Sequence, residues 1–237
     1  MHKDDIYNNK ILNIFCDAST RNRGSNVDVC YGAIAICKDD IIDQLYRVNS
    51  NSTNNNAEIK ALRAAILLAI RYKNRFSEIN IFSDSQISLF GIRDRIFKWK
   101  YNKNTERIYG YESEIKSQEV FIEILNMIID HELKVNLYHQ KGHIDINNFT
   151  SLKKAAHVFI ASNNIRDKVD YNLIRYISIN NARVDERTRR HLLSTDIYAK
   201  KIIEPIKFIP DINFYDKLNQ YYNIKNGGTN YVGQQKY

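Results

Sequence analysis

Two short apolar runs that each end in an aspartate most strongly limit what this chain can fold into. Residues 11–17 read ILNIFCD and residues 79–84 read INIFSD, and both have the composition of buried strands. Between them, residues 57–73 carry strong helix formers, with apolar residues at the helical spacing 59, 62, 66, 69 and 70. Buried strands that enclose an amphipathic helix are typical of α/β folds.

The other segments extend this pattern. Two further strands are expected at 29–38 and 41–48, after a polar turn over 18–28. Helices over 85–100 and 120–131 then lead to a fifth strand at 134–140. Three consecutive strands followed by helix, strand, helices and strand predict an α/β fold with a five-stranded mixed sheet flanked by helices.

Beyond residue 143 the pattern becomes helical. A helix is expected over 149–165, and Asp170 is a candidate cap for a second helix, which runs on or restarts at 184–194. The tail, residues 195–237, mixes aromatic and basic residues. In open α/β sheets, sites form beyond the carboxyl ends of the strands. Because Asp17 and Asp84 end two strands and His143 follows a third, we expect a site there.

The charge of the chain favours a polyanionic partner. Lys and Arg number 35 against 27 Asp and Glu, a net charge of +8, and basic side chains release counterions from nucleic-acid phosphates. The three cysteines form no CxxC pair, which argues against a zinc site or a disulfide framework. No apolar run approaches the roughly 20 residues that cross a bilayer, and the N-terminus lacks the layout of a secretory signal. We therefore expect a cytoplasmic protein with no membrane partner.

Four short motifs follow one another along the chain: DAS at 17–19, TNNNAE at 53–58, DSQ at 84–86 and KGH at 141–143. Two weaker ones accompany them: YGA at 31–33 and GIRDRIFKWK at 91–100. In order, spacing and placement these motifs resemble those of the type 1 ribonuclease H family over residues 11–143. The resemblance implies a ribonuclease H-like fold and a metal-dependent nuclease site.

The resemblance also implies particular catalytic residues. Asp17, Glu58 and Asp84 match three of the family's four metal-binding carboxylates. His143 matches the mobile histidine that moves protons near the leaving group. Clustered acids repel one another without cations, and Mg²⁺ prefers oxygen ligands. We therefore expect two Mg²⁺ ions at this site, with Mn²⁺ as a substitute.

The sequence leaves the fourth carboxylate open. In the family it lies a few residues after G-H, in N-x-x-x-D at the start of a helix. Asn181 and Asp185 have this spacing, which makes Asp185 our expected fourth metal ligand and catalytic residue. Asp170 needs a shorter insertion, and Asp145 lies closest to the KGH motif, so both remain alternatives.

Accepting Asp185 divides the chain into four parts, because the residues between KGH and Asn181 then become an insertion. These parts are a ribonuclease H-like core (1–143), a helical insertion (144–180), a terminal core helix (181–194) and a C-terminal extension (195–237). The function of the insertion and of the extension, and the oligomeric state, are not indicated by the sequence.

Six further residues match family positions that contact the substrate: Asn22, Asn54, Asn55, Gln86, Trp99 and Lys100. The four amides match positions near the 2′-hydroxyls and bases of the hybrid, and amides can pair with a 2′-OH. The alternative for them is a polar loop in an Asn-rich protein. Trp99 and Lys100 resemble the region that contacts the DNA strand and its phosphates, with core packing an equal alternative for Trp99.

Together these features predict an endonuclease that hydrolyses the RNA strand of RNA–DNA hybrids by two-metal-ion catalysis. Two alternatives remain. One is a nuclease of the same fold that acts on DNA junctions or double-stranded RNA. The other is a non-catalytic module that binds nucleic acid or protein. The biological role of hybrid cleavage and any protein partner are not indicated by the sequence.

Overall fold

A five-stranded sheet forms the centre of the protein in a computed structural model, which describes all residues except 24–25, 51, 112, 195–212 and 228–237. The strand order is β3-β2-β1-β4-β7. β1 (Ile11–Arg23) pairs antiparallel with β2 (Asn26–Cys37), which pairs antiparallel with β3 (Asp40–Ser50). On its other side β1 runs parallel to β4 (Glu78–Ser83), and β4 runs parallel to β7 (Asn136–His139). The expected mixed sheet is confirmed.

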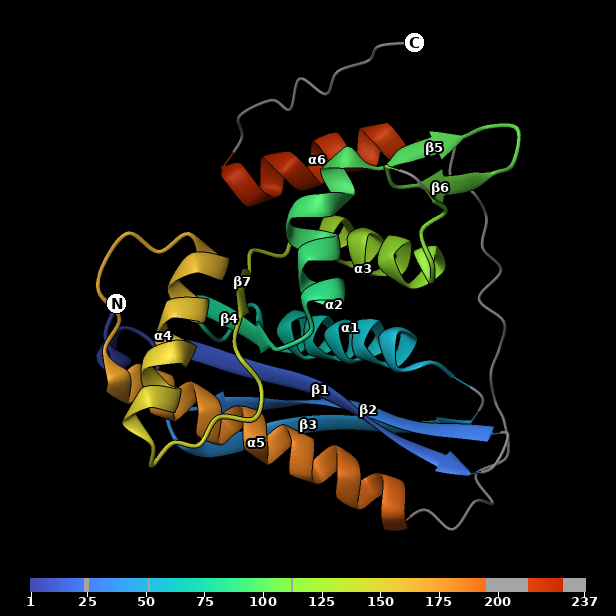
Figure 1. Ribbon diagram of the computed structural model, residues 1–237. Coiled ribbons are helices and arrows are strands. Elements are labelled where there is room, and N and C mark those ends of the chain that lie inside the picture. Colours follow the sequence, from blue (N-terminus) through green and yellow to red (C-terminus); the bar gives the residue numbers. More distant parts are fainter. Residues whose placement is uncertain (24–25, 51, 112, 195–212, 228–237) are drawn as a thin grey trace.

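Helices cover both faces of this sheet (Figure 1). α1 (Asn54–Tyr72), α2 (Gln86–Phe90) and α3 (Gln118–Asp130) lie on one side, and α4 (Phe149–Asn163) and α5 (Tyr171–Ser194) on the other. The core is divided in the same way. Ile14 and Cys16 of β1 belong to the cluster under α1, whereas Phe15 belongs to the cluster under α4 and α5. Successive side chains of a strand point to opposite faces of the sheet. A strand that is buried on both faces therefore has a continuous run of apolar residues.

The connection between α2 and α3 differs from the single helix expected over 85–100. α2 continues as a π-helical turn (Gly91–Arg95) and a 3₁₀ turn (Ile96–Lys98), and a small hairpin follows, made of β5 (Lys100–Asn102) and β6 (Arg107–Tyr109). Gly91 permits this path, because a Cβ atom there would lie 2.5 Å from the Phe121 ring. The hairpin thus projects from the core beside α3 (Figure 1).

Helices after residue 143 complete the fold. α5 is one continuous helix, which runs on through residues 171–194 and does not restart at 184. A sixth helix, α6 (Phe214–Asn226), packs on α3 and adds three buried residues to the core, Phe214, Leu218 and Tyr221. The sequence had not indicated this helix. The remainder of the expected extension, 195–212 and 228–237, lies outside the described residues.

One expected turn is wrong. β1 does not end at Asp17 but continues to Arg23, and residues 17–23 pair in register with residues 26–32 of β2. The polar side chains predict a turn, yet a paired hairpin can carry such residues on its solvent-facing side. Among the described residues, none of the helices is long and apolar enough to span a bilayer.

Candidate active site

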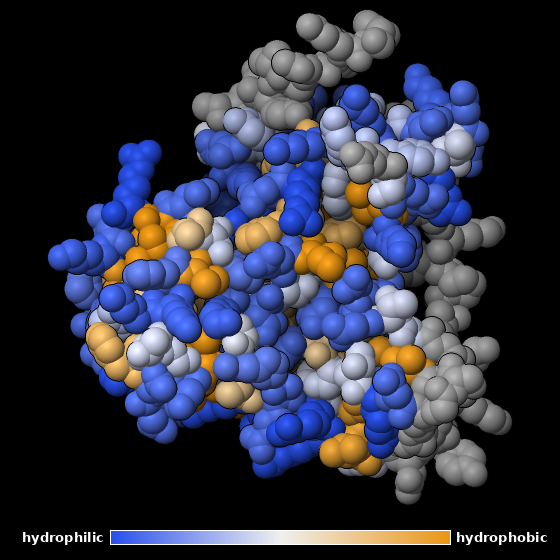
Figure 2. Space-filling view, in the orientation of Figure 1, coloured by the Kyte–Doolittle hydropathy of each residue, from blue (hydrophilic) through white to orange (hydrophobic). Residues whose placement is uncertain are grey.

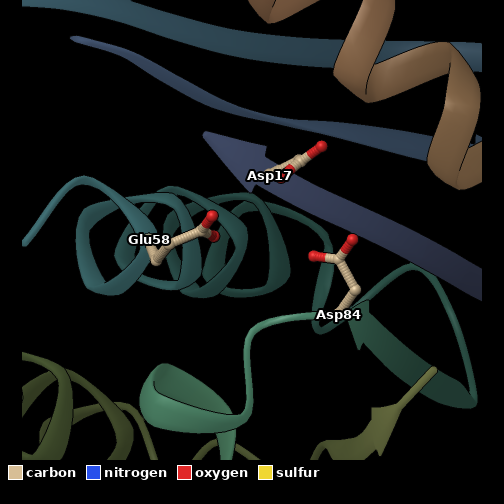
Figure 3. A group of neighbouring side chains, drawn as sticks. All are labelled: Asp17, Glu58 and Asp84. Carbon is tan, nitrogen blue, oxygen red and sulfur yellow. The ribbon is translucent and has the colours of Figure 1, made fainter. Parts of the chain in front are cut away.

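Three carboxylates converge from three elements of the core (Figure 3). Asp17 comes from β1, Glu58 from the first turns of α1, and Asp84 from the residue directly after β4. Each offers an oxygen that lies within 4.8 Å of the others. The three residues are called the acidic trio below. This spacing is suited to shared coordination of divalent cations.

The strand pairing explains why Asp17 and Asp84 meet. The parallel pairing of β1 with β4 ends at Phe15 and Phe82, two residues before each aspartate. Asp17 therefore lies in the middle of its own strand, yet just past the end of the shared ladder. The sequence had placed Asp17 at a strand end, and the relevant end is that of the pairing with β4.

Glu58 reaches the same point because of the way α1 begins. Thr53 caps the helix, and its side chain accepts a hydrogen bond from the Asn56 backbone N–H. Ala57, Ile59, Ala61 and Leu62 are buried against the sheet and fix the rotation of the helix. Glu58 is thereby held near the N-terminal end of α1, on the side that faces β1.

The acidic trio is electrostatically unfavourable without a cation. Burial, followed by the charges of Asp17, Asp84 and Asp185, raises the pKa of Glu58 to about 9. Burial and the charge of Asp84 likewise raise the pKa of Asp17, which is only 6% exposed. Burial also raises the pKa of Asp84, although a hydrogen bond from Asn181 and the charge of His143 partly oppose this. A divalent cation would remove this cost.

The trio also has an unused ligand atom. Oε2 of Glu58 is buried and has no hydrogen-bond partner among the described residues. Buried carboxylate oxygens are normally paired, and an unpaired one requires an explanation. An oxygen-rich, buried and uncompensated set of this kind fits hard cations such as Mg²⁺.

α5 carries Asp185 close enough for its charge to act on the trio, although its carboxylate lies outside the group of ligand atoms within 4.8 Å of one another. Asn181 donates a hydrogen bond to Oδ2 of Asp84 (3.4 Å), and the hydroxyls of Thr188 and Ser19 lie 2.8 Å apart. Asp185 lies four residues after Asn181 and three before Thr188, so all three occupy one face of the helix. Consistently, the charge of Asp185 raises the pKa of both Asp17 and Glu58.

The two alternatives for the fourth ligand each accept a local hydrogen bond. Asp170 precedes α5, where its side chain accepts a hydrogen bond from Asn172 and its backbone N–H donates to the carbonyl of Met1. Asp185 follows it by fifteen positions along α5, roughly 22 Å at 1.5 Å per residue. Asp145 is exposed, and its side chain accepts a hydrogen bond from Asn147 in its own loop.

The expected position of Asp185 at the start of a helix is wrong. α5 begins at Tyr171, so Asp185 lies in its interior and gains nothing from the positive end of the helix dipole. Its place is set by packing of α5 across β1 and β2, which turns Asn181 and Thr188 toward the sheet.

His143 lies in the loop after β7. It is exposed, has a left-handed backbone (φ 52°), and its charge acts on Asp84. Gly142 before it passes so close to Asp84 that a Cβ atom would lie 2.1 Å from Oδ2. The KGH loop is thus held against the trio, while the imidazole stays free of the core.

The expected substrate residues fall into two groups. Asn22 on β1, Asn54 and Asn55 in the first turn of α1, and Gln86 at the start of α2 are all exposed, on or directly beside the elements that carry the acidic trio. Lys100 is exposed on the hairpin. Trp99 is only 7% exposed and packs edge-on against Phe121, so it acts as a core residue, and its contact with substrate stays a prediction.

The sequence did not indicate His139 and Gln140 as neighbours of Asp84, and it indicated Asn181 only through its spacing from Asp185. Asn181, His139 and Gln140 are at most 4% exposed, and Asn181 bonds directly to Asp84. One signal was present, namely the polar pair His139–Gln140 at the end of an otherwise strand-like run.

On the face shown in Figure 2, hydrophilic residues predominate and apolar ones form small separate groups.

Comparison with known proteins identifies the family. The ribonuclease H family model matches residues 9–156, which is more than half of the chain. The chain belongs to the ribonuclease H family. The expected family and fold are thereby confirmed, although the matched region ends before Asp185.

Solved structures resemble this ribonuclease H family member at low identity. LC11-RNase H1, isolated from compost and solved with an RNA/DNA hybrid, is 14% identical, with a TM-score of 0.41 and coverage of 64% of this chain and 98% of that one. RNase H1 from the archaeon Halobacterium salinarum is 16% identical, with a TM-score of 0.39 and the same coverage. The RNase H domain of the foamy virus PFV is 14% identical, with a TM-score of 0.45 and coverage of 67% and 96%. No curated protein matches the chain.

Proposed function

We propose that this ribonuclease H family member is an endonuclease that hydrolyses the RNA strand of RNA–DNA hybrids with two divalent cations. The observation that carries the proposal is the convergence of Asp17, Glu58 and Asp84, with ligand atoms within 4.8 Å of one another. Membership of the family supports nuclease activity of the ribonuclease H type. The raised pKa of Glu58 and its unpaired oxygen support a cation at this point.

Four carboxylates would hold the cations. We assign the acidic trio and Asp185 to this role, because α5 carries Asp185 on the face that contacts Asp84 and Ser19. Mg²⁺ is the proposed ion and Mn²⁺ its substitute, since both accept an oxygen-only site. When bound, two such ions supply activation of the attacking water and charge stabilisation of the departing oxygen.

The chain's own residues complete the reaction. His143 is exposed beside Asp84 and can give a proton to the departing 3′-oxygen, because its imidazole is not held in the core. The products would carry 5′-phosphate and 3′-hydroxyl ends. The cations and the four carboxylates would position the scissile phosphate.

Recognition of the hybrid is assigned to exposed amides. Asn54 and Asn55 open α1 beside Glu58, and Gln86 follows Asp84 by two residues, so all three flank the trio. Amides can both donate to and accept from a 2′-hydroxyl, which distinguishes RNA from DNA. Lys100 on the hairpin is the proposed phosphate contact, with the excess of positive charge in its support.

A cleavage assay tests the proposal and its alternatives together. End-labelled RNA–DNA hybrid, RNA duplex, DNA duplex and a DNA four-way junction are incubated with the protein in Mg²⁺, Mn²⁺ or EDTA. We expect metal-dependent cuts in the RNA strand of the hybrid alone. Preferred cleavage of the RNA duplex or the junction would assign another substrate, and no cleavage of any substrate would favour a non-catalytic binding module.

A further inference from the structure

Unpaired polar atoms gather around Asp84. Five buried side-chain N and O atoms that have no hydrogen-bond partner among the described residues belong to residues that surround this aspartate. These five are Oε2 of Glu58, Nδ1 of His139, Oε1 and Nε2 of Gln140, and Oδ1 of Asn181. Because native proteins pair almost all buried polar groups, such clustering indicates a local function.

Gln140 is the most unusual of them. Gln140 is only 2% exposed, and neither end of its amide has a hydrogen-bond partner among the described residues. The reaction proposed above does not use it. A buried amide with both ends unpaired is unfavourable unless something polar joins it.

The sheet register places Gln140 next to Asp84. Ser83 and His139 form the last pair of the ladder, and the Gln140 backbone N–H donates to the Ser83 carbonyl (3.0 Å), so Asp84 and Gln140 directly follow this pair on the two strands. Adjacent residues of neighbouring strands point to the same face of a sheet. Gln140 and Asp84 are therefore side-by-side neighbours.

The contacts of the flanking residues identify this face. The ring of Tyr138 packs near Phe159 of α4, whereas that of His139 packs near Phe90 of α2. By alternation, Gln140 points to the α4–α5 side. Asn181 of α5 approaches Asp84 from that same side, through its hydrogen bond to Oδ2.

We propose that Gln140 is a positioning residue for Asp84, acting through a buried water that it shares with Asn181. Such a water accepts a hydrogen bond from Nε2 of Gln140 and donates to the Asp84 carboxylate and to Oδ1 of Asn181. About three hydrogen bonds are typical of a structural water, and two of the three partners, Nε2 of Gln140 and Oδ1 of Asn181, are otherwise unpaired among the described residues. Such a water would fix the orientation of the Asp84 carboxylate and leave its remaining lone pairs available to a cation.

This inference rests on the proposed function, because it assumes that Asp84 binds a metal. Groups that orient a metal ligand typically contribute about 10–100-fold to metal affinity. Gln140 would therefore affect cation binding, although it touches neither cation nor substrate.

Two matched glutamine substitutions test the proposal. Gln140→Met replaces the unpaired amide by an apolar chain of similar size. Gln118→Met makes the same change at a second buried glutamine, which is 1% exposed and fully engaged, since Oε1 accepts from Ile108 N and Nε2 donates to Glu114. Mn²⁺ affinity without substrate and thermal stability in EDTA are measured for the full chain and both variants.

We expect opposite results for the two variants. Gln140→Met should bind Mn²⁺ about tenfold or more weakly, keep its stability in EDTA, and recover cleavage at high Mg²⁺. Gln118→Met should lose stability and keep its Mn²⁺ affinity, because its amide is structural. Equal Mn²⁺ affinity of Gln140→Met and the unchanged protein would overturn the proposal.

Two other outcomes distinguish failure of the proposed function from failure of the role of Gln140. If the unchanged protein itself binds no Mn²⁺, the proposed function fails, not the role of Gln140 alone. If Gln140→Met does not fold, a crystal structure of the unchanged protein with Mn²⁺ decides. A water joining Gln140, Asp84 and Asn181 supports the proposal, and a Gln140 amide without such a water overturns it.

Discussion

Replacing Glu58 by glutamine should make the metal-free protein more stable and remove its response to Mg²⁺. In the folded state burial and three neighbouring acids raise the pKa of Glu58 to about 9, from an ordinary value of 4.5. The unfolded chain therefore releases this proton at lower pH than the folded one. As pH rises from 4.5 toward 9, ionisation favours the unfolded state, so Glu58 lowers the free energy of unfolding progressively over this range.

The size of the effect follows from the two pKa values. Each pH unit between them corresponds to about 1.4 kcal/mol, so the three units up to pH 7.5 set an upper limit of about 4 kcal/mol. Part of this repulsion is shared with Asp17 and Asp84, which also take up protons, so we expect a gain of about 2 kcal/mol. For a chain of this size that raises the melting temperature by roughly 4–8 °C.

Thermal unfolding measured at pH 5.5 and 7.5, with EDTA or Mg²⁺, provides the assay. In EDTA, Glu58→Gln should melt higher than the unchanged protein, and more so at pH 7.5. Mg²⁺ should stabilise only the unchanged protein, because a ligand is missing in the variant.

Glu123→Gln is the matched control. This glutamate also lies on a helix but has a cationic partner, Arg63, so its loss should bring no gain in stability and no change in the Mg²⁺ response. The reasoning would be refuted if Glu58→Gln melted below the unchanged protein in EDTA, or if Mg²⁺ stabilised both equally.

Three further substitutions test separate parts of the site. His143→Ala should slow cleavage about 10²–10⁴-fold without weakening metal binding; an unchanged rate across pH 6–9 would exclude a proton-transfer role. Asp185→Asn should abolish most activity and weaken Mn²⁺ binding, while Asp170→Asn stays near the original rate; the reverse result would exchange the two assignments. Lys100→Ala should weaken hybrid binding and lower the slope of log affinity against log salt by about one, and an unchanged slope would remove this phosphate contact.

Most of the core was predictable because its signals are local. The apolar runs that became β1 and β4, and the amphipathic pattern that became α1, need only near neighbours in sequence to be recognised. The acidic trio was predicted from motifs that lie on these same elements. Its side chains meet because the strands and helix carry them there.

Other features depended on partners distant in sequence. The polar half of β1 is a strand only because β2 pairs with it, and α6 packs on α3, which lies about 90 residues earlier in the sequence. Asp185 was chosen by its spacing from Asn181, yet its location in the middle of α5 follows from packing on the sheet. Gln140 carried no motif, and only the register with Asp84 makes it noticeable.

The most direct test of the central claim compares the original protein with Asp84→Asn, purified in parallel, on a labelled RNA–DNA hybrid. The parallel preparation controls for a nuclease carried over from the expression host. We predict Mg²⁺-dependent cleavage of the RNA strand by the original protein, none in EDTA, and none by Asp84→Asn, which should remain folded. Cleavage by Asp84→Asn at the original rate would contradict the account, because the acidic trio would then not be the active site.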